Sequence, residues 1–279
     1  MGYGVVDDFA KSFPKQFLNA GVAEQNMMGM AAGLAHSGYK VFVYSIANFP
    51  TIRCLEQIRN DVCYHNLDVT IVAIGAGFGY GTLGYSHFAI EDLAVLRCLP
   101  NLNIYSPGDT YELEVTLDQI ATDKGPSYLR LGKNGEKPLL GATLENPFSA
   151  RVIKEGSGKF AILSTGNIGI EVTKALSQIP EALSSQITHF SIPSMSYKTL
   201  DNSTLQDFSR ILTVEEHRLS GGFGSFVLEY LEHFQIFAQV RRVGVSNTAD
   251  FPIGDHDFIK QFAGVDSLAI HRAALKHFS

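Results

Sequence analysis

Residues 40–75 read KVFVYSIANFPTIRCLEQIRNDVCYHNLDVTIVAIG, and this stretch decides the fold class. Its two ends, 40–46 and 68–75, are apolar, β-branched runs of the length of a buried strand. Between them, residues 50–62 carry apolar side chains at helical spacing. A strand, a helix and a second strand in this order indicate a parallel sheet covered by helices, which is an α/β fold.

The same alternation continues along the chain and divides it in two. The sequence predicts further strands at 103–107, 127–131, 160–166, 187–193, 210–216 and 238–245, and helices at 112–122, 168–178, 201–207, 222–234 and 257–276. Residues 136–157 are rich in Gly, Pro, Asn and charge, which indicates a linker with one hairpin. We therefore predict two α/β domains, 1–135 and 158–279, each a mostly parallel sheet flanked by helices.

The first domain opens on a helix-like stretch at 5–13 with no strand before it. Because a parallel sheet with helices on both faces usually begins with a strand, we expect the first strand of this domain to be missing from the chain.

Composition excludes several classes of protein. The 279 residues are 45% hydrophobic and 18% charged, as in a globular protein. A net charge of −6 without a basic cluster argues against nucleic acid and anionic membranes as partners. No apolar run reaches membrane-spanning length and no signal peptide pattern opens the chain, so we expect a cytoplasmic protein.

Cysteine and histidine spacing predicts neither a disulfide framework nor a metal site. Cys54, Cys63 and Cys98 form an odd, sparse set, which indicates buried, reduced thiols. The nine histidines show no metal-ligand spacing. We expect no metal to be bound by this chain alone.

Residues 17–40, FLNAGVAEQNMMGMAAGLAHSGYK, predict a short strand and turn leading into a helix. That helix is apolar nearly all round, which is typical of a buried helix. Glu24 lies in its first turn, where a buried carboxylate is costly unless it is paired or protonated. Glu24 either caps the positive end of the helix or has a chemical role, and both interpretations stay open at this point.

A glycine-rich loop, GAGFGYGTLGYSHF (75–88), follows the second strand, at the sheet edge where α/β proteins bind ligands. It resembles a dinucleotide-binding loop only superficially, because no helix opens directly after it and no acidic residue ends a later strand. His87, at the far end of the loop, is either a structural group or a functional one.

These blocks together resemble the transketolase family. GVAEQNMMGMAAGLA (21–35), CLEQIRND (54–61), the segment 87–112 and PSYLRLGK (126–133) are similar to its pyrimidine-binding half, and TVEEHRLSGGFGS (213–225) to its C-terminal domain. Within the family, the chain most resembles the C-terminal subunit of split-chain enzymes. Similar blocks occur in deoxyxylulose-phosphate synthase and in pyruvate dehydrogenase β subunits.

The resemblance implies roles for named residues. These enzymes use thiamine diphosphate, and Glu24 would hydrogen-bond the aminopyrimidine ring of the cofactor and so activate it. Phe49 or Tyr44 would supply an aromatic wall for that ring, with Ile46 beside it. His87 would bind substrate oxygens near the reacting carbon.

Further positions match substrate contacts in part. Lys133 lies near a basic residue that holds a sugar phosphate in full-length transketolases, and Arg130 matches a basic residue of deoxyxylulose-phosphate synthase, although a surface salt bridge would explain either one. Leu83 occupies the position where transketolases have an acidic residue that contacts a hydroxyl group of the acceptor substrate. Tyr85 occupies the position where they have a proline. Because leucine cannot accept a hydrogen bond, we expect an acceptor other than the usual aldose phosphate.

The family's diphosphate-binding GDG motif is absent from the sequence. We therefore expect a separate subunit to supply the diphosphate site and Mg²⁺, in an α2β2 assembly that transfers a two-carbon ketol unit between sugar or oxo-acid substrates. Two alternatives remain: acyl transfer from pyruvate, as in deoxyxylulose-phosphate synthase or pyruvate dehydrogenase, and a non-catalytic subunit that only binds a partner. Glycine turns at 163–169 and 215–225 indicate tight turns or anion sites, and His217 has no assigned role.

Overall fold

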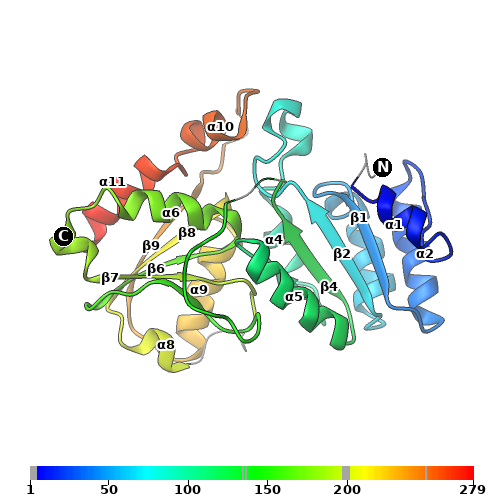
Figure 1. Cartoon of the computed structure of the whole chain (residues 1–279), viewed down its shortest axis with the longest axis horizontal. Coiled ribbons are helices and arrows are strands. Elements are labelled where there is room, and N and C mark those ends of the chain that lie inside the picture. The colour runs from blue at the N-terminus through cyan, green and yellow to red at the C-terminus, as the bar shows by residue number, and fades with distance from the viewer. Residues whose placement is uncertain (1–4, 134, 136, 197–201, 249) are drawn as a thin grey trace.

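The chain folds into two sheets that lie side by side, each flanked by helices (Figure 1). The computed structural model describes residues 5–133, 135, 137–196, 202–248 and 250–279. Within these residues no helix is long and apolar enough to span a membrane. The predicted α/β class with two mostly parallel sheets is confirmed.

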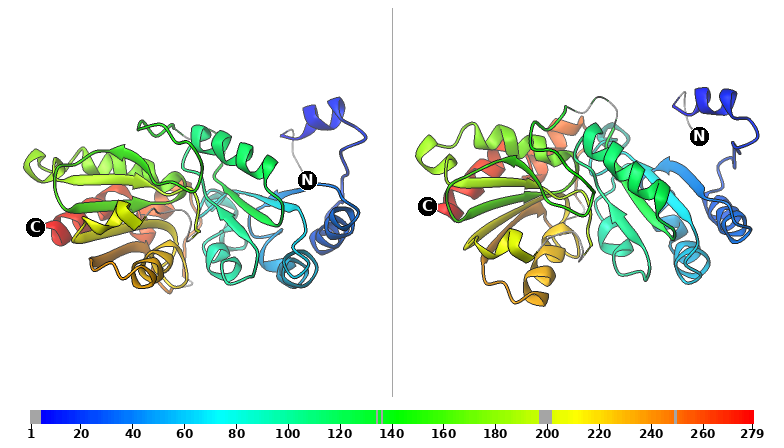
Figure 2. Two further views of the ribbon diagram at one scale, coloured as in Figure 1. Left: turned by 90° about the horizontal axis from the view of Figure 1, so that it is seen from below. Right: turned by 60° about the horizontal axis from the view of Figure 1, so that its bottom comes forward.

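The first sheet is entirely parallel, with the strand order β1-β2-β4-β3. Its strands are β1 (Val41–Ile46), β2 (Val69–Ile74), β3 (Asn103–Tyr105) and β4 (Ser127–Leu131). The helical segments of this half are α1 (Asp7–Ser12), α2 (Glu24–His36), η1 (Ile52–Cys54), α3 (Leu55–Gln57), η2 (Ile58–Cys63), η3 (Gly81–Leu83), η4 (Tyr85–His87), α4 (Asp92–Leu96) and α5 (Thr110–Thr122). Figure 2 shows α1 at the end of the molecule away from the second sheet.

The second sheet has the order β5-β7-β6-β8-β9, and only its edge strand β5 is antiparallel. Its strands are β5 (Arg151–Lys154), β6 (Phe160–Ser164), β7 (Ile187–Ser191), β8 (Arg210–Arg218) and β9 (Gln239–Val245). Its helical segments are η5 (Gly166–Ile168), α6 (Gly169–Leu176), α7 (Glu181–Ser184), α8 (Asn202–Gln206), α9 (Phe223–His233), α10 (His256–Ala263) and α11 (Ser267–Phe278).

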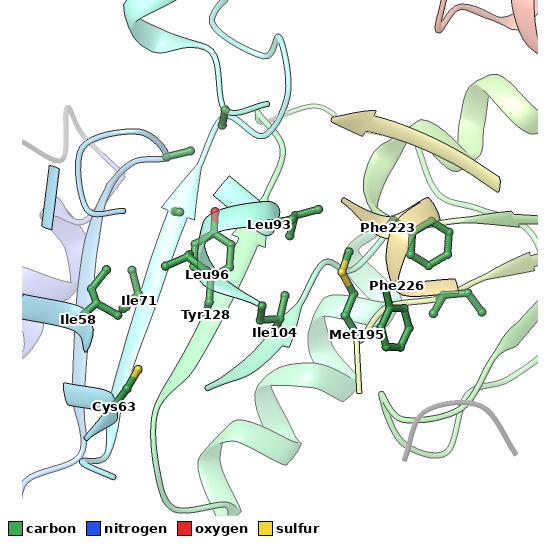
Figure 3. Close-up of a cluster of buried hydrophobic side chains, with 14 of the residues drawn as sticks. Ile58, Cys63, Ile71, Leu93, Leu96, Ile104, Tyr128, Met195, Phe223 and Phe226 are labelled. Atoms are coloured by element: carbon green, nitrogen blue, oxygen red, sulfur yellow. The ribbon is translucent and has the colours of Figure 1, made fainter. Parts of the chain in front are cut away.

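One hydrophobic core joins the two sheets. Ile71 of β2 and Tyr128 of β4 are paired in register and belong to the same buried cluster as Phe223 and Phe226 of α9. Figure 3 shows Leu93 and other side chains of this cluster between the two halves. A shared core of this kind fixes the relative position of the halves, since close-packed side chains deform little.

Two predicted helices differ from the structure. The single helix expected at 50–62 is a 3-10 turn, one α turn and a π turn in succession (η1, α3 and η2). Short π segments of this type are rare and often lie at functional sites. The helix expected at 257–276 is broken at Gly264, whose left-handed φ of +70° ends α10 before α11 begins.

The segment that precedes α2 and the helix itself also differ from expectation. Residues 17–23 form no strand. Helix α2 buries one face, which includes Met28 and Ala31, but leaves Met30 and Leu34 exposed on the other. The prediction of an all-round buried helix is therefore wrong for the isolated chain.

Smaller corrections concern the linker and the thiols. The segment 136–157 contains β5, which pairs with β7 of the second sheet and not within a hairpin. The domain boundaries at 135 and 158 stay predictions. Cys54 and Cys63 are buried free thiols, as expected, whereas Cys98 is exposed.

Arg151 of β5 ties the second sheet to the start of α5. Its guanidinium donates to Asp109 Oδ2 at 3.0 Å and to the carbonyl oxygen of Leu139 at 2.9 Å, and it lies 3.4 Å from Glu112 Oε1. All three charged side chains are buried. Removing the cation would leave buried carboxylates without their counter-charge.

We therefore expect Arg151→Met to destabilise the chain by about 3–5 kcal/mol, measured as a lower urea midpoint. The exposed Arg59, whose guanidinium donates to the side chain of its neighbour Asn60, provides the control Arg59→Met. Equal midpoints for the two variants would contradict this account of β5.

Candidate active site

Glu24 opens helix α2 and is 6% exposed. Its Oε2 accepts a hydrogen bond from Arg53 Nη1 at 2.9 Å. Arg53 lies in η1, after β1, and its side chain is 48% exposed. The buried Glu24 carboxylate is thus paired with the Arg53 guanidinium, as we expect because burying an unpaired charge is energetically costly.

The same guanidinium lies over an aromatic ring. Arg53 Cζ is 4.7 Å from the centroid of Phe49, within the range of a cation–π contact. The Phe49 ring in turn meets the His87 ring edge to face, with centroids 5.2 Å apart. Glu24, Arg53, Phe49 and His87 form a continuous row of contacts, which we call the Glu24–His87 row.

His87 is held in this row by two neighbouring polar groups. Ser86 Oγ lies 3.0 Å from His87 Nδ1, within hydrogen-bond distance. Asn48 Nδ2 donates to the Ser86 carbonyl oxygen at 3.2 Å, which links the turn after β1 to the glycine-rich loop. The loop that follows β2 is therefore fastened to the turn that carries Phe49.

Cys54 lies beside the row without a chemical role. Its Sγ donates to the carbonyl oxygen of Phe49 at 3.4 Å. Burial, with a smaller contribution from Glu24, raises the pKa of the Cys54 thiol to about 11. Since the thiolate is the nucleophile, Cys54 is unreactive at neutral pH.

The side chains of Tyr44 and Ile46 lie on one face of strand β1. Both alternate along β1 with Val43, which packs into the core against α2, so their side chains leave the opposite face of the strand. Burial, followed by the neighbouring Tyr80, raises the pKa of the Tyr44 hydroxyl. Of the three residues expected at the aromatic wall, Phe49 has a ring that contacts Arg53 and His87, whereas Ile46 meets Phe49 through a backbone hydrogen bond, in which the Phe49 N–H donates to the Ile46 carbonyl oxygen at 2.8 Å.

Leu83 and Tyr85 flank the row differently. Leu83 is 52% exposed at the end of η3. The Tyr85 hydroxyl lies 3.3 Å from Glu91 Oε1 and 3.2 Å from Arg218 Nη2, so it is engaged with the second half of the chain. Leu83 therefore offers an apolar surface, while Tyr85 contributes its hydroxyl to a contact between the halves.

The two basic candidates have contrasting surroundings. Arg130 is 2% exposed, donates to Asp92 Oδ2 at 2.7 Å, and also donates to the carbonyl oxygens of Ala89 and Glu216. The structure does not bring it into the Glu24–His87 row, and it stabilises the interior. Lys133 is exposed and its Nζ lies 5.3 Å from the centroid of Tyr80.

A cleft of about 460 Å³ lies between part of the glycine-rich loop and the second half. Lys133 lines it together with Thr82 of the loop. The second half lines it with charged residues of α6, β8 and α10, among them Glu171, Glu216 and His256. Among the described residues, no group of three side chains is arranged to ligate a metal ion.

Sequence reasoning missed Arg53, Asn48 and Ser86. The signal for Arg53 was a basic residue within the apolar pattern of 50–62, directly after a turn. Its partners lie 29 residues before it and four residues before it, in segments that no local pattern connects. The polar pair Asn48 and Ser86 left no such signal.

Comparison with known proteins identifies the family. A family model described as transketolase, pyrimidine binding domain, matches residues 4–135. A putative transketolase C-terminal section from Methanocaldococcus jannaschii is 34% identical over 275 residues, which span 96% of this chain and 84% of that protein. The chain belongs to the transketolase family.

Other relatives agree with this transketolase assignment. One of the subunits of apulose-4-phosphate transketolase from Actinobacillus succinogenes is 30% identical over 96% of this chain and 86% of that protein. A 1-deoxy-D-xylulose-5-phosphate synthase from Syntrophus aciditrophicus is 36% identical over 85% of this chain, but only 37% of that protein. A solved structure described as a split gene transketolase, inactive beta4 tetramer, has a TM-score of 0.82 at 32% identity, covering 97% of this chain and 86% of that one.

Transketolases are thiamine diphosphate-dependent transferases, and the site fits the pyrimidine ring of that cofactor. Arg53 presents a planar N–H donor that is bonded to Glu24 and lies over Phe49. An aminopyrimidine is likewise a planar donor that needs a carboxylate at its edge and an aromatic ring at its face. The side chains around Arg53 therefore suit such a ring.

Acid should weaken the contact between the two halves through His217 of β8, whose Nε2 accepts a hydrogen bond from the Ala94 backbone N–H at 3.3 Å. This imidazole is fully buried, and burial lowers its pKa to about 4 from an ordinary 6.5. A histidine that protonates more readily when unfolded stabilises the native state above pH 6.5, and that stability is lost as the pH falls toward 4.

We expect the urea midpoint to fall between pH 6.5 and pH 4, by a contribution of roughly 3 kcal/mol from His217. In His217→Gln this dependence should be shallower, because glutamine does not titrate. Parallel pH profiles for the wild type and the variant would contradict the assignment.

Proposed function

We propose that this chain is the pyrimidine-binding subunit of a two-subunit transketolase, which works with a separate subunit that holds the diphosphate and Mg²⁺. The pairing of Glu24 with a planar donor over Phe49 is the observation that carries the proposal. The high coverage of a transketolase C-terminal section and of a subunit of apulose-4-phosphate transketolase supports the same division of labour.

Each residue of the row has a distinct task in this proposal. Thiamine diphosphate, when bound, would supply the nucleophilic carbon that this class of chemistry needs at the carbonyl group of a ketose or 2-oxo acid. Glu24 holds the proton at the pyrimidine edge, in a buried setting that strengthens the hydrogen bond. Phe49 orients the ring by stacking. His87 reaches substrate oxygens from the facing loop and stabilises negative charge that develops there.

A partner subunit would complete the site from the side of α2. The GDG motif is absent from the sequence, so the chain lacks the family's diphosphate-binding element. Helix α2 begins at Glu24, and its outer face exposes Met30 and Leu34 beside the open Gly29 and Gly33. A subunit packed on this face, in an α2β2 assembly, would bury apolar surface and close the cofactor site together.

The acceptor differs from the usual aldose phosphate in this proposal. Leu83 takes the place of the acidic residue of the family and offers no acceptor for a sugar hydroxyl. A hydroxyl group of the acceptor substrate that is buried beside Leu83 without a hydrogen-bond partner would weaken binding by about 1–3 kcal/mol. A deoxy sugar, a nucleotide-linked keto sugar or a less polar aldehyde fits this position better, with Lys133 available for a distant anionic group.

A second candidate function is acyl transfer from pyruvate. The 36% identity to a 1-deoxy-D-xylulose-5-phosphate synthase favours it, although the match covers little more than a third of that protein. A subunit without catalysis is a third candidate. Donor specificity separates the first two, and loss of turnover in a Glu24 variant separates both from the third.

Isothermal titration with thiamine diphosphate and Mg²⁺ tests the composite site. We expect no binding to this chain alone and binding to its mixture with a candidate partner that carries the diphosphate motif. Glu24→Gln in the mixture should lower turnover by about 100- to 10,000-fold while weakening cofactor binding much less. The exposed Glu56 provides the control Glu56→Gln, which should behave as wild type.

Tight binding by the lone chain would refute the division of labour, because the diphosphate site would then lie in this subunit. Binding by the mixture with unchanged turnover in Glu24→Gln would refute the role of Glu24. No binding in either sample would favour the non-catalytic candidate.

Leu83→Asp tests the acceptor. The aspartate would supply an oxygen that accepts a hydrogen bond from a sugar hydroxyl, and one hydrogen bond to a charged group is worth about 1.5–3 kcal/mol. The variant should therefore raise kcat/KM for ribose 5-phosphate by about tenfold or more and lower kcat/KM for a less polar aldehyde. Steady-state kinetics with both acceptors measure this switch. A wild-type preference for ribose 5-phosphate would contradict the proposal.

A further inference from the structure

The end of strand β8 docks onto the glycine-rich loop of the other half. Glu216, near this end, is 2% exposed. Its Oε1 accepts a hydrogen bond from the backbone N–H of Phe78 at 2.6 Å, across 138 residues of sequence. Two residues on, the backbone N–H of Arg218 donates to the Ile90 carbonyl oxygen at 2.9 Å. The second sheet therefore holds both sides of the loop.

The loop is closed at its base by backbone hydrogen bonds, so a contact that fixes Phe78 also restrains the position of His87. Gly77 and Ala89 exchange two backbone hydrogen bonds, of 3.0 and 2.8 Å. Phe78 is the first residue inside this closure, and His87 lies two residues before Ala89. Movement of the base would shift His87 against Phe49, which contacts it through a single ring edge.

The contact is steric as well as polar. Gly77 has a φ of +62°, a conformation that favours glycine. A Cβ on Gly77 would overlap the carboxyl group and Cγ of Glu216. The Phe78 ring also packs edge to face against Phe88 and lies 5.5 Å from Phe251 of the second half. The loop thus approaches Glu216 as closely as a backbone can.

His256 keeps Glu216 in its charged form. His256 Nε2 lies 2.7 Å from Glu216 Oε1. Burial raises the pKa of the Glu216 carboxyl, but His256, the Phe78 N–H and Lys260 together outweigh burial, and the pKa is lowered overall. Lys260 and Asp257 of α10 are the other charged groups that act on His256. A charged acceptor binds a backbone N–H more strongly than a neutral one.

We propose that Glu216, supported by His256, is a positioning residue that holds the loop carrying His87 in its place against Phe49. Glu216 contacts neither Glu24 nor Phe49, so it acts through the loop alone. The second half of the chain then contributes to catalysis indirectly, by positioning His87, in addition to its packing. This inference deepens the proposed function and rests on it for the role of His87.

Hydrogen exchange on the full chain tests the hold without cofactor or partner. In Glu216→Ala, the amides of residues 77–90 should exchange about ten- to a hundredfold faster than in the wild type, because a hydrogen bond to a charged group is lost. Glu216→Gln keeps the length and one acceptor oxygen, so it should restore much of the protection. Glu216→Asp keeps the charge but is too short to reach Phe78, so it should not.

Glu171 provides the matched control. It is a buried carboxylate that lines the same cleft, but it accepts hydrogen bonds from Lys174, Lys260 and the Ser267 backbone, all within the second half. Glu171→Ala and Glu171→Gln should change exchange near α6, α10 and α11 and leave residues 77–90 unchanged. If Glu216→Ala does not fold, Gly77→Ala perturbs the same contact and should give the same local exchange.

Turnover of the complex with its partner separates positioning from stability. Glu216→Ala should lower kcat about tenfold or more with unchanged affinity for thiamine diphosphate, Glu216→Gln should recover most of kcat, and Glu171→Gln should match the wild type. A folded Glu216→Ala chain with wild-type exchange at 77–90, or with a loosened loop and normal kcat, would overturn the inference. If the wild-type complex shows no turnover, the proposed function fails, while the exchange data still decide whether Glu216 holds the loop.

Discussion

A buried arginine sets the constraint on which the site depends. Arg130 and Asp92 form an ion pair in the interior, where each must have its partner, since losing one member of such a pair costs about 3–5 kcal/mol. To satisfy its donors, Arg130 also binds the carbonyl oxygens of Ala89 and Glu216. One side chain thus joins β4, α4, the glycine-rich loop and β8, and the contact between the halves is fixed where His87 must be held.

The groups that we propose act in catalysis come from three separate elements. Glu24 starts a helix, Phe49 lies in the turn after β1, and His87 lies in the loop after β2. In a parallel sheet these two strand ends share one edge, which is where such folds place their ligands. Arg53 contacts both Glu24 and Phe49. In the proposed function, the planar pyrimidine ring would take the place of its guanidinium.

The sequence predicts the fold and part of the site. Long apolar runs separated by helical spacing were enough to locate the described strands except the edge strand β5, because a strand that is buried on both faces is a continuous apolar run. The sequence could not predict that α2 is buried on one face only. Exposure of Met30 and Leu34 depends on which surfaces the rest of the chain covers. The partners of Arg53 and Arg130 could not be predicted either, because their contacts join distant segments of the chain. A charged residue also gives the same sequence signal whether it lies on the surface or in a buried ion pair.

The most direct test of the central claim is a structure of this chain with its partner subunit, thiamine diphosphate and Mg²⁺. We predict that the Glu24 carboxylate leaves Arg53 and hydrogen-bonds the pyrimidine ring, that this ring stacks on Phe49, and that the diphosphate and Mg²⁺ lie on the partner. A cofactor bound away from Glu24, or a Glu24–Arg53 pair that persists beside an occupied site, would contradict the account.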